Sequence, residues 1–565
     1  MTQGPHRAIR MRTLLLGLFV LASVIAFTLA GTAASETTAT GVILNVEAAP
    51  TGPIQANYNP FQQRSQFFQI GAAYQIYEPL MQWNPLRPKQ ITPWLATSAK
   101  WAKTGKALTI KLRHGVRWSD GKPFTAADVA YTFQLLKSTP ALNGNGVSFS
   151  GVAAKGADTV VITFSQPSEA QEYIITGATL IVPKHIWSSQ SDPGSYANPK
   201  PVGTGPFVLS SAGTQSLLLT KNTKYWQKGL PKIGGLRYIA FDANPSANLA
   251  LSQGRLDWAG NFVPNINQQY VSKDPKHNFY WMVPRRTTML CPNILKYPFG
   301  MVAVRKAMSM AIDRKAMSIA GEQGQQPPAT TPTGLMLPAH ISYLAPKYKN
   351  LRYKVDVAGA KKLLEDAGFK MGSNGIYNMP NGKPFKASIL SVAPFTDVMI
   401  DMQVIAQQLK KIGMDVDVEG AAIDAWIGRS VVGDFDITFG CGGQPTDPSP
   451  FTLLNNALNS SFFAPLGKPA PFPNNYQRWK DSQTDAALNA YLNATTDAGR
   501  RLTMYAIEKE MVEKVPAIPI FYNVDFSEYR TTKVTGWPTR GNPYSSPSPT
   551  GPTAEVVAIH LTPVK

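Results

Sequence analysis

The side chains that most often carry enzymatic or metal chemistry are thinly spread along this chain. No histidine lies within four residues of another, so no helical pair of metal ligands is present. The chain also lacks a G-x-S-x-G nucleophile elbow, an H-E-x-x-H zinc motif and a P-loop. We therefore predict no metal site, no cofactor and no catalytic residues. The histidines are His6, His114, His185, His277, His340 and His560.

One group of carboxylates leaves an enzymatic alternative open. Asp434, Asp436 and Asp447 lie close together in sequence. Most glycoside hydrolases use a pair of carboxylates as catalytic residues. Solvated acids in loops far outnumber catalytic ones, so a binding protein is the favoured interpretation. A secreted hydrolase that works with carboxylates from a cleft is the alternative.

The elements that must position any site are clearest in segment 114–136, HGVRWSDGKPFTAADVAYTFQLL. Asp120 and Gly121 form a dipeptide that tolerates the positive φ angles of a tight hairpin. Thr125 is a helix N-cap residue, and Asp128 follows three residues later, in a relative of the capping box. The segment therefore predicts a strand, a turn, a second strand and a helix.

The rest of the chain divides near Arg285. Strands such as GVILNVEA, ALTIKLR and TVVITF precede it, whereas helices and strands alternate from there to about Pro516. One helix is expected to start at Asp356 and to stop at Gly368. A last strand is expected over AEVVAIHL, residues 554–561. Two extended crossings, near Thr287 and Ile518, predict a hinge and a cleft between two lobes that is a natural ligand site.

Composition supports an ordered protein of more than one domain. The chain has 565 residues, of which 44% are hydrophobic and 16% charged, and its net charge is +20. The basic residues are spread out, without a stretch interleaved with aromatics. We therefore favour adhesion to an anionic cell surface, or an unusual growth environment, over nucleic-acid binding. We expect a monomer.

The N-terminus is typical of a secretory signal. Arg7, Arg10 and Arg12 precede the apolar run 14–30, and the small residues GTAASE follow it. We predict cleavage near residue 34, which places the protein outside the cytoplasm; an uncleaved anchor is the alternative. Removing three arginines from +20 leaves +17.

The only two cysteines are Cys291 and Cys441. Neither follows the leader, so the cysteine of a lipoprotein anchor is absent. A disulfide between them and two buried free thiols are both open at this point.

Several segments together resemble family 5 of the extracellular solute-binding proteins. The segments are LRHGVRWSDGKPFTAADVAYTFQLLKS, YQIYEPLMQWNP, PVGTGPFVL with NTKYWQKGLPKIGGLRYIAF, LALSQGRLDWA, FGMVAVRKAMSMAIDRKAM and AKKLLEDAGF. They occur in family order over nearly all of the mature chain. Members of this family are receptors of ABC importers for oligopeptides, dipeptides, nickel complexes and some oligosaccharides.

The resemblance implies an α/β, two-lobed periplasmic-binding-protein-like fold with a hinge and a cleft between the lobes, in which the first lobe carries an inserted α/β domain. It also implies that the lobes close around the ligand and that the closed form docks on the transmembrane subunits of an ABC permease. The expected limits are 1–34 for the signal peptide, 41–73, 203–284 and 521–565 for the discontinuous domain of lobe I, 74–202 for its inserted domain, and 285–520 for lobe II.

The ligand class depends on the stretch GDFDITFGCGGQPTDPSPF. In peptide-binding relatives, the corresponding loop reads roughly G-W-x-x-D-x-x-[DE]-P, and its aspartate holds the α-ammonium group of the ligand. Aligned on Asp447, the tryptophan position is Cys441 and the ammonium-binding position is Gln444. A neutral amide both donates and accepts hydrogen bonds, which suits sugar hydroxyls or amides better than a cation. An oligopeptide and a short oligosaccharide therefore both stay open.

Sugar ligands also need aromatic platforms. The candidates in this chain are Trp83, Trp281, Trp426, Phe451 and Trp537. The C-terminal segment GWPTRGNPY, which contains Trp537, resembles tails of oligosaccharide-binding members.

Overall fold

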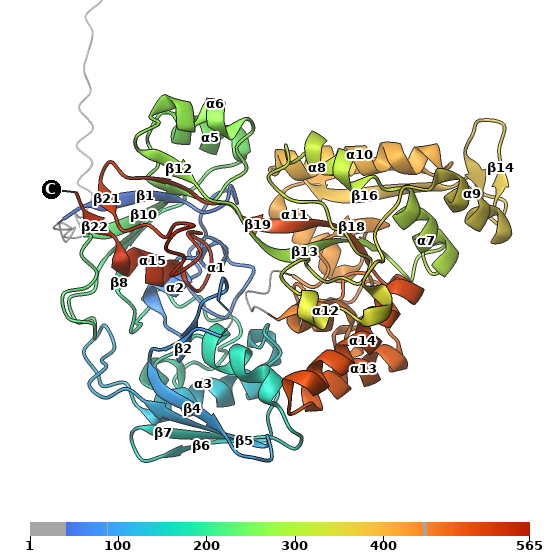
Figure 1. Cartoon of the computed structure of the whole chain (residues 1–565). Coiled ribbons are helices and arrows are strands. Elements are labelled where there is room, and N and C mark those ends of the chain that lie inside the picture. Colours follow the sequence, from blue (N-terminus) through green and yellow to red (C-terminus); the bar gives the residue numbers. More distant parts are fainter. Residues whose placement is uncertain (1–40, 88, 444–448, 565) are drawn as a thin grey trace, which may run out of the picture. The chain divides into compact units, whose positions relative to one another are not determined.

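The structure is a computed structural model, and it describes residues 41–87, 89–443 and 449–564. Its described part is a mixed α/β fold built on three larger sheets (Figure 1). The predicted signal peptide, residues 1–34, lies outside the described residues. Within the described ranges, no helix is long and apolar enough to span a membrane.

The first large sheet has seven strands, in the order β12-β20-β11-β1-β10-β9-β8. The predicted strand GVILNVEA is confirmed as β1, which pairs in parallel with β10 and β11. Leu44 and Val46 alternate with less buried neighbours along β1 and are fully buried in the core. The strands are β1 (Ile43–Glu47), β8 (Phe207–Ala212), β9 (Ser216–Lys221), β10 (Gly235–Ile239), β11 (Trp258–Ala259), β12 (Asn278–Tyr280) and β20 (Glu528–Arg530).

The second sheet has four antiparallel strands, β4 (Ala96–Trp101), β5 (Ala107–Leu112), β7 (Thr159–Thr163) and β6 (Gly151–Lys155), and helix α3 (Ala126–Ser138) contacts it. Strand β5 alternates buried and less buried residues, as a half-buried strand should. We call the seven-stranded and four-stranded sheets with their helices lobe I.

For segment 114–136, the predicted tight turn and the predicted helix cap are confirmed. Gly121 has a φ of +97°, and the N–H of Thr125 donates to the Asp128 carboxylate over 2.9 Å. The two strands expected beside the turn reduce to an isolated bridge between Arg117 and Pro123. Pro123 lacks the backbone N–H that a regular ladder needs at this position.

The third sheet has five strands, in the order β17-β16-β18-β13-β19, and we call it with its helices lobe II. The predicted helix cap is confirmed, because the Asp356 carboxylate accepts the Gly359 N–H over 2.7 Å, and Gly368 has a φ of +89°. The strands are β13 (Val283–Pro292), β16 (Lys386–Val392), β17 (Asp415–Ala421), β18 (Ile437–Phe439) and β19 (Ile518–Asp525).

The larger helices of lobe II belong to one continuous apolar core with this sheet. They are α7 (Val302–Ala311), α8 (Arg314–Ala320), α9 (Val357–Asp366), α10 (Thr396–Lys411), α11 (Ile423–Val432), α12 (Pro450–Leu458), α13 (Ser482–Asn493) and α14 (Asp497–Lys514). The smaller elements are α1 (Gln66–Gln69), α2 (Ala73–Ile76), α4 (Lys184–Trp187), α5 (Asn244–Ser252), α6 (Ile266–Gln269), β2 (Met81–Trp83), β3 (Ile91–Pro93), β14 (Lys370–Met371) and β15 (Tyr377–Asn378).

The two predicted crossings are strands β13 and β19, which pair antiparallel over most of their length. Strand β13 directly follows β12 of the seven-stranded sheet, and β19 directly precedes β20 of the same sheet. Two adjacent strands therefore connect lobe I to lobe II, as a hinge requires. The residue limits given above for the domains stay a prediction.

The last predicted strand is wrong. Residues Ala554–His560 form helix α15, and only Thr562–Pro563 continue as a short strand, β22, which pairs with β21 (Val534–Thr535). The apolar run AEVVAIHL is compatible with a strand and with the 3.6-residue period of a helix, since Ala554, Val557 and Ala558 fall on one helical face. That face packs into the core of lobe I, which decides in favour of the helix.

The two cysteines form a disulfide, so the alternative of two free thiols is wrong. Cys291 in β13 and Cys441, which follows β18, have Cα atoms 6.0 Å apart, and both residues are buried. The bridge ties the crossing strand to the segment in which the family motif begins.

Candidate functional site

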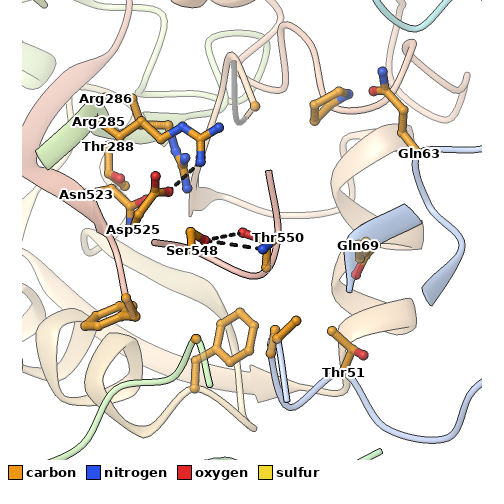
Figure 2. A pocket seen from close by; sticks show the side chains of 18 of the residues that line it. Thr51, Gln63, Gln69, Arg285, Arg286, Thr288, Asn523, Asp525, Ser548 and Thr550 are labelled. Carbon is orange, nitrogen blue, oxygen red and sulfur yellow. Dashed lines mark hydrogen bonds and ion pairs between the residues drawn. The ribbon is translucent and has the colours of Figure 1, made fainter. Parts of the chain in front are cut away.

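A cavity of about 380 Å³ lies beside the crossing strands and is lined by residues of both lobes. This volume is within the range of small-molecule sites. Figure 2 shows Thr51, Gln63 and Gln69 of lobe I on one side and the β13 and β19 side chains on the other. The labelled residues of those two strands are Arg285, Arg286, Thr288, Asn523 and Asp525.

Side-chain amides are the commonest polar groups in the cavity wall. An amide offers both a donor and an acceptor, so such a wall can bind sugar hydroxyls and peptide groups equally well. An amide carries no charge of its own that would select an ammonium group. The amides are those of Gln63, Gln69, Asn145, Asn244, Asn261, Gln326, Asn456 and Asn523.

Trp426, one of the predicted site residues, lines the cavity from helix α11. Its Nε1–H donates to Thr438 Oγ1 over 3.0 Å, and its ring stacks on Phe439 with centroids 5.2 Å apart. The indole is therefore held in place before any ligand arrives, as an aromatic platform requires. Other aromatic lining residues are Phe68, Tyr74, Tyr173, Phe262, Phe395, Phe439, Phe472, Phe521 and Phe526.

Two arginines and an aspartate bring charge to the wall at the hinge. The Arg285 guanidinium donates to one oxygen of Asp525, and the Ser546 hydroxyl donates to the other over 2.8 Å. Burial opposes the charge of Arg285, yet the nearby Asp525 carboxylate holds its pKa above the usual value. Burial, and then repulsion by Arg285, lower the pKa of Arg286 to about 9.

A second acid, Asp397 on helix α10, lines the cavity from lobe II. Asn244, on α5 of lobe I, donates to Asp397 Oδ1 over 3.1 Å, so this contact joins the lobes. Burial raises the pKa of Asp397 to about 6. Behind it lie Glu322 and Asp401, whose pKa values burial also raises.

The two residues that carried the ligand prediction, Gln444 and Asp447, lie outside the described residues. The glycines Gly440 and Gly443, which precede them in the family motif, do line the cavity. The motif therefore begins at the cavity wall.

The remaining predicted site residues do not line this cavity. Cys441 is in the disulfide, and Phe451 stacks on Tyr491 with centroids 4.2 Å apart. Both are buried, so neither offers a face to a ligand in this cavity. Their roles in binding stay predictions that the cavity does not favour.

Three tryptophans have other surroundings as well. The Trp83 indole donates to Thr176 over 3.1 Å, and the Trp537 indole donates to the Arg530 carbonyl over 3.0 Å. The Trp281 backbone N–H pairs with the Ser527 carbonyl. These residues are not in the cavity wall, so their contact with ligand also stays a prediction.

The described carboxylates of the hydrolase alternative are engaged elsewhere. Asp434 pairs with Arg429 over 3.1 Å, and Asp436 pairs with Lys296 over 3.0 Å. Neither lines the cavity, and Asp447 lies outside the described residues. Within the described ranges, no cluster of three or more potential metal-binding side chains is found.

Sequence reasoning missed the charged residues of the hinge, Arg285, Arg286 and Asp525. A signal for them existed: two adjacent arginines stand in a strand that was expected to cross between lobes. Charges in a buried crossing strand need a partner or a ligand.

Comparison with known proteins decides the family. Residues 90–463 match the family described as "Bacterial extracellular solute-binding proteins, family 5 Middle". The chain belongs to this family. It is accordingly a solute-binding protein rather than an enzyme, and the fold and transport class predicted from the sequence are confirmed.

Relatives with curated names cover most of the chain. Protein XP55 of Streptomyces lividans is 27% identical over 430 residues, which are 75% of this chain and 74% of that protein. Di/tripeptide-binding protein 1 of Pseudomonas aeruginosa is 26% identical over 522 residues, or 87% and 91% of the two chains.

Among solved structures, a periplasmic oligopeptide-binding protein of Thermotoga maritima with bound mannohexaose matches with a TM-score of 0.84. It is 24% identical, and the match covers 93% of this chain and 99% of that one. At this identity the likeness supports the fold.

Proposed function

We propose that this protein captures an oligopeptide or a short oligosaccharide between its two lobes and delivers it to the permease of an ABC importer. The observation that carries the proposal is the cavity at the hinge, whose wall combines crossing strands and both lobes of a family 5 solute-binding protein. A site built across a hinge can enclose a ligand when the lobes close.

The cavity chemistry fits both ligand classes. Amides can exchange hydrogen bonds with the peptide backbone or with sugar hydroxyls, and Trp426 offers an indole for a sugar ring or an apolar side chain. The relatives include both ligand classes: one is named a di/tripeptide-binding protein, and one structure holds mannohexaose.

Closure of the lobes is supported by hydrogen bonds that join lobe I to lobe II. Asn244 donates to Asp397, and Gln55 donates to Asp424 over 3.3 Å. The Gln325 amide donates to the Val263 carbonyl over 2.9 Å. A ligand that contacts both lobes adds its own differential affinity for the closed arrangement to these bonds.

The proposal includes one step before ligand capture and one step after it. Cleavage after residue 34 releases a protein that acts outside the cytoplasm, and the closed form then docks on the transmembrane subunits of the permease. N-terminal sequencing of the protein exported by its native host tests the first step, and intact residues 1–34 would contradict it.

The test of the function is a thermal-shift screen of the purified protein. Di- to pentapeptides are compared with cello-, xylo- and manno-oligosaccharides, and each incubated ligand is then analysed by mass spectrometry. We expect a member of one class to raise the melting temperature and to be recovered intact, since binding to the folded state stabilises it. Turnover of ligand, or no stabilisation by either class, would contradict the proposal.

A further inference from the structure

Two neighbouring arginines of β13 reach the same cavity because the strand is irregular at this point. Side chains of a regular strand alternate between faces, so Arg285 and Arg286 would point in opposite directions. The pairing of β13 with β19 shifts register between Pro284 and Arg286, as in a β-bulge. Both arginines therefore line the cavity, with Thr288 two residues further along.

Among the described residues, only the first of these arginines has a hydrogen-bonded protein partner. Arg285 pairs with Asp525, and the second oxygen of Asp525 accepts the Ser546 hydroxyl. Each oxygen of that carboxylate therefore already accepts a hydrogen bond from another residue, and none of these donors is Arg286. In the described ranges of the chain, neither a hydrogen bond nor an ion pair reaches the Arg286 side chain.

Arg286 nevertheless keeps its charge at neutral pH. Its pKa of about 9 is lowered by burial and by Arg285, with only Asp525 acting in the opposite direction. A charge that is largely removed from water and unpaired costs free energy, and an anion beside it would recover that cost. The other acid of the described wall, Asp397, is hydrogen-bonded to Asn244.

We infer that the transported ligand carries a carboxylate, and that the Arg286 guanidinium binds this group next to Thr288 and the Arg285–Asp525 pair (Figure 2). This inference rests on the proposed function and narrows its ligand. The planar guanidinium fork matches a carboxylate with two parallel hydrogen bonds. A carboxylate also balances a single unpaired cation, whereas a phosphate monoester carries about −1.5 to −2 charges.

Two sources can supply this carboxylate: the free C-terminus of a peptide, or an acidic sugar residue of an oligosaccharide. The inference thus differs from the neutral ligand suggested by Gln444 alone. Gln444 concerns the absence of an ammonium anchor, while Arg286 supplies an anchor for an anion. A ligand without a free amine and with a carboxylate satisfies both.

The experiment is calorimetric titration of the full mature protein with matched ligand pairs. One pair is a peptide, free or amidated at its C-terminus; the other is a uronic-acid oligosaccharide and its neutral counterpart. We expect the anionic member of one pair to bind about tenfold to hundredfold more tightly than its neutral partner. The pair that responds identifies the source.

Variants then assign the effect to Arg286. Arg286→Gln should bind the anionic ligand as weakly as the neutral one, and Arg286→Lys should keep part of the preference. Arg237→Gln is the matched control, because Arg237 is an exposed arginine on strand β10. Unliganded Arg286→Gln should melt at or above the wild-type temperature, since it loses an unpaired charge; this excludes misfolding as the cause.

The outcomes distinguish failure of the carboxylate site from failure of the proposed solute-binding function. Equal affinity for both members of each pair, or an equal loss of both members in Arg286→Gln, would overturn the carboxylate site while leaving solute binding intact. Failure of every form of both classes to bind would overturn the proposed function itself.

Discussion

At the scale of single residues, Gln444 stands where the family resemblance places an aspartate that holds the ligand's α-ammonium group. A charge-assisted hydrogen bond contributes about 1.5–3 kcal/mol, of which a neutral amide keeps only part. We predict that Gln444→Asp improves the affinity for peptides with free N-termini by about tenfold and leaves sugar binding unchanged or weaker. Titration with peptides and sugars measures both effects.

Titration of the wild-type protein with peptides can also contradict this interpretation of Gln444. If the wild-type protein binds free peptides tightly and loses them once the N-terminus is acetylated, another acid holds the amine. Asp447 and Asp424 would then be the first candidates, and the interpretation of Gln444 would be wrong.

A second residue-scale prediction concerns Glu47, at the end of strand β1. Burial raises the pKa of this fully buried carboxyl to about 8, although the nearby Gly260 backbone acts in the opposite direction. The folded protein thus holds this proton more tightly than the unfolded chain, whose glutamate pKa is 4.5. The resulting stability is complete below about pH 4.5 and is lost as the pH rises through about 8.

The expected loss from Glu47 alone is on the order of 3 kcal/mol between pH 4.5 and pH 7. Urea unfolding at several pH values measures it, and Glu47→Gln should show a flatter dependence. Glu513→Gln, which changes an exposed glutamate on helix α14, is the control and should follow the wild type. Identical pH profiles for Glu47→Gln and wild type would contradict the assignment.

At the scale of elements, the disulfide ties strand β13 to the segment after β18, across 150 residues of sequence. We predict that the double variant Cys291→Ala/Cys441→Ala unfolds with about 2–4 kcal/mol less free energy, mainly because its unfolded chain gains freedom. Denaturant unfolding measures this change. A reductant should destabilise the wild type and leave the variant unaffected; equal stability of the two proteins without reductant would contradict the prediction.

The elements that the sequence predicted correctly are those with local signals. The turn at Gly121 and the helix stop at Gly368 both show positive φ angles, which glycine adopts at little cost. The helix cap at Asp356 is similarly local. Residues 554–561 were assigned to a strand because a short apolar run fits both periods, and only packing against lobe I selects the helix.

The site was predictable only in part, for a physical reason. Trp426 could be proposed because sugar ligands need aromatic platforms, and it is one of the aromatic residues that the sequence offers for this role. The structure places it in the cavity wall. The approach of Arg286 to the cavity depends on an irregularity in the pairing of β13 with β19, which no local pattern reveals. The pairing of Arg285 with Asp525 joins residues 240 positions apart and depends on the same two strands.

At the scale of the whole molecule, the account requires lobe movement about β13 and β19. Two strands that pair over most of their length can bend together with few broken hydrogen bonds, and the cavity lies beside them. Ligand bound there contacts both lobes and therefore favours the closed arrangement by its differential affinity. An enzyme with a rigid cleft would need no such movement.

Small-angle scattering of the mature protein, with and without a saturating ligand from the thermal-shift screen, tests this central claim most directly. The account predicts a smaller radius of gyration when ligand is bound, and intact ligand afterwards. An unchanged radius of gyration at full occupancy would contradict capture of the solute by closure of the two lobes.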